Sequence, residues 1–146
     1  MTARILCAID FSPSAHEAMR VAADLAKDKR ATLDLVYVED RPLWTSEPFL
    51  RLPGDIPQEV LEARRRELEA WRHEAELRAG ASVSGRTASG TPWDEIVKVA
   101  KADPSIETIV IGTHGRTGIS HVLLGSVAER VVRHAPCNVL VVRARG

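Results

Sequence analysis

Short apolar runs alternate along the chain with longer segments in which apolar residues recur every three or four positions. The runs at residues 4–9, 32–38 and 106–111 are rich in aliphatic side chains, which is typical of strands covered on both faces. Residues 83–88 are more polar and predict a strand near a sheet edge, and the run from Val139 to Val142 predicts the last strand.

The helix after the first strand has two alternative start signals. Ser12 can cap a helix that has Pro13 at its first position, or Ser14 can form a capping box with Glu17. Both alternatives are compatible with an apolar face of four residues at helical spacing: Ala18, Val21, Ala22 and Leu25.

Three more helices are expected. The longest spans residues 58–79 and should stop at Gly80, because glycine readily adopts the left-handed conformation that ends helices. Another follows Thr91, with Pro92 at its first position, and runs to about residue 102. The last spans residues 126–134. Strands that alternate with helices predict an α/β fold, with a parallel sheet and helices on both faces, in one domain over residues 1–146.

Composition and charge exclude several classes of protein. The 146 residues are 45% apolar, and they contain no run near the ~20 apolar residues that a membrane span needs. The N-terminus lacks the apolar core of a secretory signal, and two cysteines form no disulfide framework, so we expect a cytoplasmic protein. Twenty basic residues balance 20 acidic ones, which argues against a nucleic-acid binder.

Two segments leave alternatives open. From residue 108 onwards, five arginines and one glutamate give a local charge of +4, which suits either a solvated surface, the favoured interpretation, or an anionic ligand. Residues 39–57 contain four of the eight prolines together with Trp44 and Phe49. A loop of this length is either functional or a surface excursion held by its aromatic residues.

Four of the nine glycines fall between residues 112 and 125, directly after the buried fourth strand. Ligands of open α/β sheets bind beyond the carboxyl ends of the strands, and glycine lets the backbone approach a phosphate closely. Gly125 and Ser126 then open a helix, whose N-terminal N–H groups attract anions. Alternatively, Ser126 is only a helix cap in a capping box with Glu129, and the glycines serve turns.

The glycine spacing differs from the P-loop and from the dinucleotide fingerprint, but it matches G-x2-G-x9-G-[ST] at Gly112, Gly115, Gly125 and Ser126. That is the ATP-binding pattern of the universal stress protein family, which the sequence resembles throughout. The likeness includes residues 5–12, 109–116, 124–131 and 137–142. Only residues 39–57 lie in a region where the family varies freely.

The resemblance implies a site for ATP, with or without Mg²⁺. Asp10 resembles the aspartate that contacts the adenosine part, and Val38 the residue whose backbone meets the adenine edge. Residues 111–115 would wrap ribose and phosphates, residues 125–127 would hold the phosphate tail, and Arg116 would meet a phosphate or be solvated. The full set of implied binding residues is Ala8, Ile9, Asp10, Val38, Ile111, Gly112, Thr113, His114, Gly115, Arg116, Gly125, Ser126 and Val127.

The resemblance also implies a five-stranded parallel sheet in the order 3-2-1-4-5. It further implies a homodimer formed through the strand from Val139 to Val142, which would cover an apolar sheet edge.

The function that follows is an ATP-binding sensor or regulator in the stress response, in which nucleotide favours one loop state that an unknown protein partner recognises. The alternatives are a slow ATPase or nucleotide-dependent transferase, for which Asp10 is the one strand-end carboxylate, and an interaction module without a physiological nucleotide. No catalytic residue is assigned, and the five histidines have no metal-ligand spacing. Cys7 should be buried and inert, and Cys137 structural.

Overall fold

The computed structural model describes residues 2–40, 57–114 and 124–144. Within these ranges, five strands and four helices alternate as the sequence predicts. Their bounds are β1 (Arg4–Ile9), α1 (Pro13–Lys29), β2 (Thr32–Asp40), α2 (Gln58–Ala79), β3 (Val83–Gly90), α3 (Pro92–Ala102), β4 (Ile106–Gly112), α4 (Ser126–His134) and β5 (Asn138–Val142).

The five strands form one parallel sheet in the order β3-β2-β1-β4-β5, which confirms the expected α/β fold and strand order. β1 lies at the centre, so its side chains are covered on both faces. All five residues from Ile5 to Ile9 are no more than 5% exposed. This explains why β1 is an uninterrupted apolar run, whereas β3 at the edge is polar.

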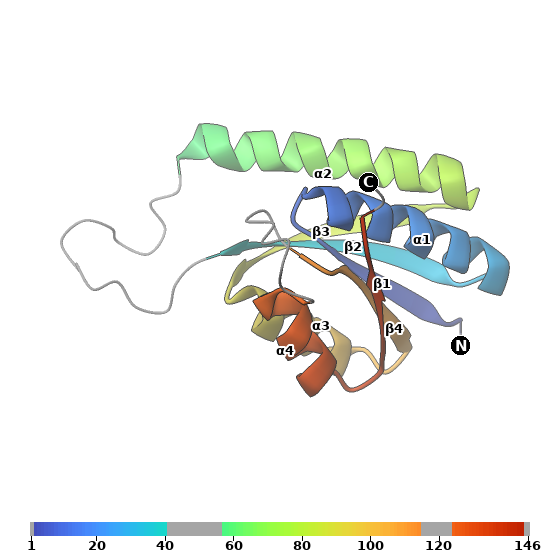
Figure 1. The fold of residues 1–146 in the computed structure, drawn as a ribbon. Helices are drawn as coiled ribbons and strands as arrows, with labels where there is room; N and C mark the ends of the chain where they lie inside the picture. The colour runs from blue at the N-terminus through green and yellow to red at the C-terminus, as the bar shows by residue number, and fades with distance from the viewer. Residues whose placement is uncertain (1, 41–56, 115–123, 145–146) are drawn as a thin grey trace.

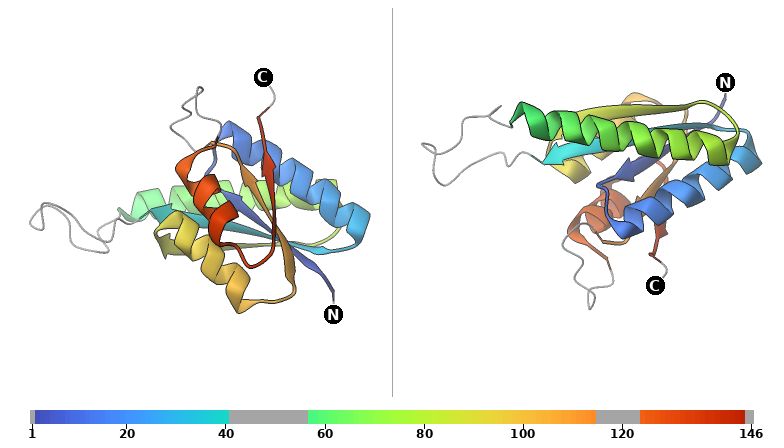
Figure 2. Two further views of the ribbon diagram at one scale, coloured as in Figure 1. Left: turned by 60° about the horizontal axis from the view of Figure 1, so that its bottom comes forward. Right: turned by 90° about the horizontal axis from the view of Figure 1, so that it is seen from above.

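The helices form two layers, one on each face of the sheet (Figure 1). α1 and α2 cover one face, and α3 and α4 cover the other, as two further views also show (Figure 2). α1 presents small side chains to the sheet, such as Ala18 and Ala22, each fully buried. At the N-terminal end of α1, Ser14 lies directly against Gly112 at the end of β4.

The structure settles which start signal the first helix uses. Ser12 is the N-cap of α1, and its hydroxyl oxygen accepts a hydrogen bond from the Ala15 N–H at 3.2 Å. Pro13 therefore occupies the first helical position, and the capping box at Ser14 is not the start of the helix. At the end of α2, Gly80 has φ +70°, as predicted for the stop.

Two strands extend two residues beyond their predicted ends. β2 continues past Val38 to Asp40, and β3 continues past Ala88 to Gly90, because the two extensions pair with each other: Glu39 lies opposite Ser89, and Asp40 opposite Gly90. The predicted loop from residue 39 consequently begins later, and its residues 41–56 lie outside the described part of the chain.

A charged cluster lies near the amino ends of β1, β2 and β3. Asp34 in β2 is fully buried, and its carboxylate accepts hydrogen bonds from the Arg4 guanidinium at 3.0 and 3.3 Å and from the Ser84 hydroxyl. This pairing compensates for burial of the carboxylate and raises the pKa of Arg4, mainly through the hydrogen bond to Asp34. None of the helices within the described ranges is long and apolar enough to cross a membrane.

Candidate functional site

A cavity of about 710 Å³ opens at the carboxyl ends of β1, β2 and β4. The chain runs from β1 to β2 on one side of the sheet, and returns later to place β4 on the other side of β1. Ligands of open α/β sheets bind at such a switch point, because the two connections leave it in opposite directions and a crevice remains between them. Residues at the N-terminal ends of α1, α3 and α4 complete the walls.

The structure describes eleven of the thirteen predicted binding residues, and all eleven line this cavity. The remaining two, Gly115 and Arg116, lie outside the described residues. The eleven come from three strand ends and one helix N-terminus: Ala8, Ile9, Asp10, Val38, Ile111, Gly112, Thr113, His114, Gly125, Ser126 and Val127.

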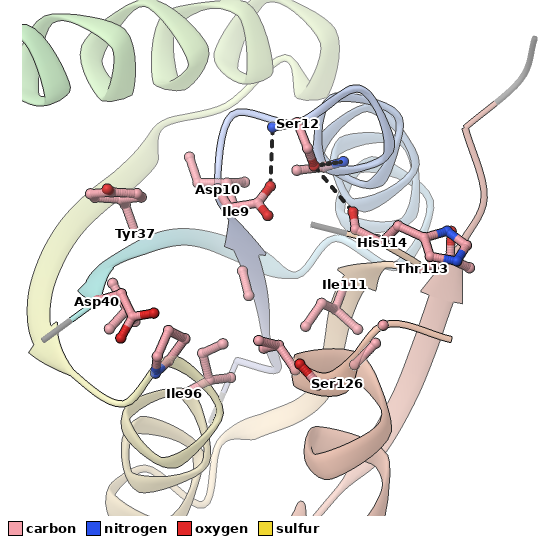
Figure 3. A pocket seen from close by; sticks show the side chains of 18 of the residues that line it. Ile9, Asp10, Ser12, Tyr37, Asp40, Ile96, Ile111, Thr113, His114 and Ser126 are labelled. Carbon is pink, nitrogen blue, oxygen red and sulfur yellow. Dashed lines mark hydrogen bonds between the residues drawn. The ribbon is translucent and has the colours of Figure 1, made fainter. Parts of the chain in front are cut away.

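Asp10 follows β1 directly and lines the cavity beside Ser12, between Tyr37 and His114 (Figure 3). Its carboxylate accepts a hydrogen bond from the Ser12 N–H at 3.0 Å, which fixes one oxygen against the start of α1. Between them, Phe11 adopts the left-handed backbone conformation at φ +63°, which is rare for a bulky residue. Its ring packs against Tyr37 and Trp71 at centroid distances of 4.9 and 5.2 Å, and these contacts support the strained turn.

Backbone hydrogen bonds bring the two ends of the glycine-rich segment together. The Thr113 N–H donates to the Val142 carbonyl of β5 at 2.9 Å, and the Thr113 carbonyl accepts from the Gly125 N–H at 2.6 Å. Gly125 is therefore held beside the end of β4, and α4 begins at the cavity wall.

Among the described residues, no side chain caps the N-terminus of α4. Gly125 is the N-cap residue and makes no side-chain hydrogen bond, while Ser126 is the first helical residue and is exposed. The alternative in which Ser126 is the helix cap is therefore wrong. Figure 3 shows Ser126 at the cavity, on the side opposite Tyr37. Helix N-terminal N–H groups without a side-chain cap provide a site for an anion.

Several cavity residues were missed by sequence reasoning. Tyr37, Glu39 and Asp40 come from the end of β2, and Pro92 and Ile96 come from the start of α3. The rule that strand ends and helix N-termini line such crevices could have found them. Glu39 and Asp40 escape this rule, because the sequence predicts that β2 ends at Val38.

The described lining carries four carboxylates and one histidine: Asp10, Glu39, Asp40, Glu129 and His114. Glu39 accepts a hydrogen bond from the Tyr37 hydroxyl at 2.6 Å, which holds its carboxylate near the aromatic cluster. Neither lysine nor arginine occurs among the described lining residues. An anionic ligand in this cavity must therefore be neutralised by backbone N–H groups, by a cation that it brings, or by residues outside the described ranges.

Other candidate residues are engaged elsewhere. His16 pairs with Glu74 at 2.8 Å and lies against Trp71, and His134 stacks on Trp93. In the part of the chain that the structure describes, no group of three or more histidine, cysteine or acidic residues could hold a metal ion.

Both cysteines are free thiols, and burial is the main cause that raises the pKa of each. Cys7 is fully buried in β1, and Cys137 packs beside the core between the sheet and α3 and α4.

Comparison with known proteins decides the family. The sequence profile of the universal stress protein family matches residues 1–143. This chain belongs to the universal stress protein family. A universal stress protein from Methanocaldococcus jannaschii is 34% identical over 152 residues, which cover 96% of this chain and 81% of the relative.

Solved structures of the family share the fold. UspA from Lactobacillus plantarum superposes with a TM-score of 0.82 at 28% identity, covering 97% of both chains. A universal stress protein solved in complex with cAMP superposes with a TM-score of 0.70 at 25% identity, covering 98% of both chains.

Proposed function

We propose that this universal stress protein binds an adenine nucleotide, ATP above all, in the cavity at the carboxyl ends of β1, β2 and β4. The observation that carries the proposal is the α4 N-terminus, which opens at the cavity wall and is capped by no side chain of the described residues. A bound phosphate would accept hydrogen bonds from the N–H groups at the start of α4.

The cavity divides into an apolar part and a part lined by backbone. Ala8, Val38, Ile96 and Ile111 provide apolar walls suited to the flat faces of a purine. Asp10 is placed to accept hydrogen bonds from ribose hydroxyls. The phosphates then lie between the backbone of residues 112–114 and the start of α4, with Gly115 and Arg116 as further proposed contacts.

A divalent cation should accompany the phosphates. ATP carries about four negative charges at neutral pH, and the described lining adds four carboxylates without a lysine or arginine. Mg²⁺ is commonly bound through substrate phosphates together with one or two carboxylates, so this acidic lining suits a Mg²⁺–nucleotide complex better than the free anion. The relative solved with cAMP supports the adenine nucleotide class.

We further propose that nucleotide occupancy is recognised by a partner protein in the cytoplasm. The free thiols fit a reducing compartment. Thr113 connects the proposed phosphate region to β5 through its hydrogen bond to Val142, so a ligand there acts on the last strand as well. Equal affinity of a partner for the protein with and without ATP would contradict this sensor role.

The test is a calorimetric titration of nucleotide-stripped protein with ATP, with and without Mg²⁺. We expect micromolar binding that strengthens with Mg²⁺ and is lost in Gly125→Val, whose side chain would crowd the phosphates. Gly85→Val adds the same side chain on β3, against Leu68 of α2 and away from the cavity, and should bind ATP like the wild type. Absence of binding at millimolar ATP would contradict the proposal.

A homodimer through β5 is the second proposal. β5 pairs with β4 on one edge, no described strand pairs with the other, and Leu140 is 39% exposed. An apolar edge of this kind favours pairing with a second copy. Light scattering at micromolar concentration should give a dimeric mass that Leu140→Lys reduces to a monomer. Leu77→Lys, at a residue on α2 that is 74% exposed, should leave the mass unchanged. A monomeric wild type would contradict the proposal.

A further inference from the structure

Two buried serines at the start of α1 hold the backbone of His114. The Ser14 hydroxyl donates to the His114 carbonyl at 2.5 Å, and its oxygen faces the His114 N–H at 3.4 Å. The Ser12 hydroxyl donates to the same carbonyl at 3.3 Å. The two serines are only 3% and 5% exposed, so these bonds are shielded from water and hold the backbone firmly.

The two serines differ in what else they do. Ser12 is the N-cap of α1, and its contact with His114 accompanies that role. Ser14 lies inside the first turn, and its hydroxyl hydrogen-bonds to His114, a residue 100 positions away. The local helix therefore explains Ser12, but it does not explain why a hydroxyl is needed at Ser14.

Gly112 shows how closely the end of β4 approaches this serine. A Cβ atom at Gly112 would lie 2.4 Å from the Ser14 hydroxyl oxygen and 2.8 Å from the Ser14 carbonyl carbon. Both distances are far below contact, so only glycine allows the observed approach. The contact with α1 thus requires glycine at position 112, the first glycine of the motif, whether or not a ligand is bound.

We propose that Ser14 is a positioning residue for the phosphates of the bound nucleotide. By holding His114 against α1, it fixes the backbone of residues 112–114 relative to Gly125 and the start of α4. This inference rests on the proposed nucleotide site and deepens it: Ser14 acts on the phosphate chain, and the adenosine part is held by other walls of the cavity. Ser14→Ala should therefore weaken the binding of ATP but not that of adenosine.

The experiment compares ATP and adenosine affinities of the folded variant by calorimetry, in the presence of Mg²⁺. Loss of one hydrogen bond predicts that Ser14→Ala weakens ATP binding about five- to tenfold while adenosine affinity stays within about twofold. Ser84→Ala is the matched control. It removes a serine hydroxyl that bonds a buried carboxylate at the other end of the sheet, and it should change neither affinity.

A second measurement needs no nucleotide. In the ligand-free protein, Ser14→Ala should speed hydrogen exchange of the His114 amide, and Ser84→Ala should not. Equal losses for ATP and adenosine, unchanged ATP binding, or an unchanged His114 exchange rate would overturn the inference while wild-type ATP binding upholds the proposed function. A wild type that fails to bind ATP would instead overturn the proposed function.

Discussion

Thr113 and Gly125 meet at the cavity wall, where the Gly125 N–H donates to the Thr113 carbonyl at 2.6 Å. Thr113, which follows Gly112 at the end of β4, thus directly holds Gly125, the N-cap residue of α4. The position of the proposed phosphate region is therefore a property of the protein backbone. The stability of this region can therefore be measured without any ligand.

Gly112→Ala should destabilise the ligand-free protein. The added methyl group would clash with both the side chain and the backbone of Ser14, and such overpacking typically costs about 1–3 kcal/mol of unfolding free energy. Urea unfolding followed by circular dichroism measures the loss. Gly85→Ala is the control, because a Cβ atom there would meet Leu68 at 3.4 Å, an ordinary contact. Equal stabilities of the two variants would contradict the prediction.

Phe11→Gly should be more stable than Phe11→Ala. Both substitutions remove the ring that packs on Tyr37 and Trp71, but only glycine adopts φ +63° without strain. The difference should be about 1 kcal/mol in favour of glycine. Thermal unfolding checks the order. At the exposed Glu62 in α2 the order should be reversed, with alanine more stable than glycine by a similar amount. The same order at both positions would disprove the strain argument.

Acid should destabilise the connection between α2 and β3 through Glu76. The Val83 N–H donates to its carboxylate at 3.1 Å and, together with Arg72, holds the pKa of Glu76 below its ordinary value of 4.5. Because the folded pKa is depressed, this contribution is present above pH 4.5 and is lost as the pH falls through the folded pKa.

The urea concentration at the unfolding midpoint of the wild type should accordingly decrease when the pH is lowered from 6 to 3. The midpoint of Glu76→Gln should decrease less over the same range. Glu62→Gln, which changes an exposed residue of the same helix, should follow the wild type. A Glu76→Gln curve parallel to that of the wild type would show that this carboxylate has no part in the acid sensitivity.

The two thiols should report on unfolding. Cys7 is fully buried, and burial raises the pKa of its thiol, so it should not react with a disulfide reagent at pH 8 in the native protein. Cys137 is half-buried and should react slowly. The native protein should therefore release at most one equivalent of chromophore and the urea-unfolded protein two. In Cys137→Ala, reaction of the native protein at the rate of a free thiol would contradict this assignment.

Local sequence signals predicted most of the fold. The helix from Gln58 to Ala79 has its predicted bounds, and Gly80 ends it as expected. Its buried residues Leu68 and Ala75 are apolar residues at helical spacing. The glycine pattern placed its described residues at one cavity, since strand ends and helix N-termini meet there in any sheet of this order.

Contacts between distant segments could not be predicted in this way. Nothing near Ser14 indicates that its hydroxyl bonds His114, because the partner comes from a different strand connection. The extension of β2 to Asp40 depends on its pairing with β3, and local composition does not predict which strands pair. Likewise, Ser126 resembles a cap in sequence, but the bond between Thr113 and Gly125 places Gly125 in the cap position instead.

The central place of β1 has a consequence for synthesis of the chain. β1 leaves the ribosome before β4, with which it pairs from Arg4 opposite Ile106 onwards, so one edge of the central strand stays open until β4 has been made. During that interval the apolar side chains of Leu6 and Ala8 lack their neighbours in β4 and the cover of α4. A nascent chain stopped before β4 is therefore the form most prone to aggregate and most in need of a chaperone.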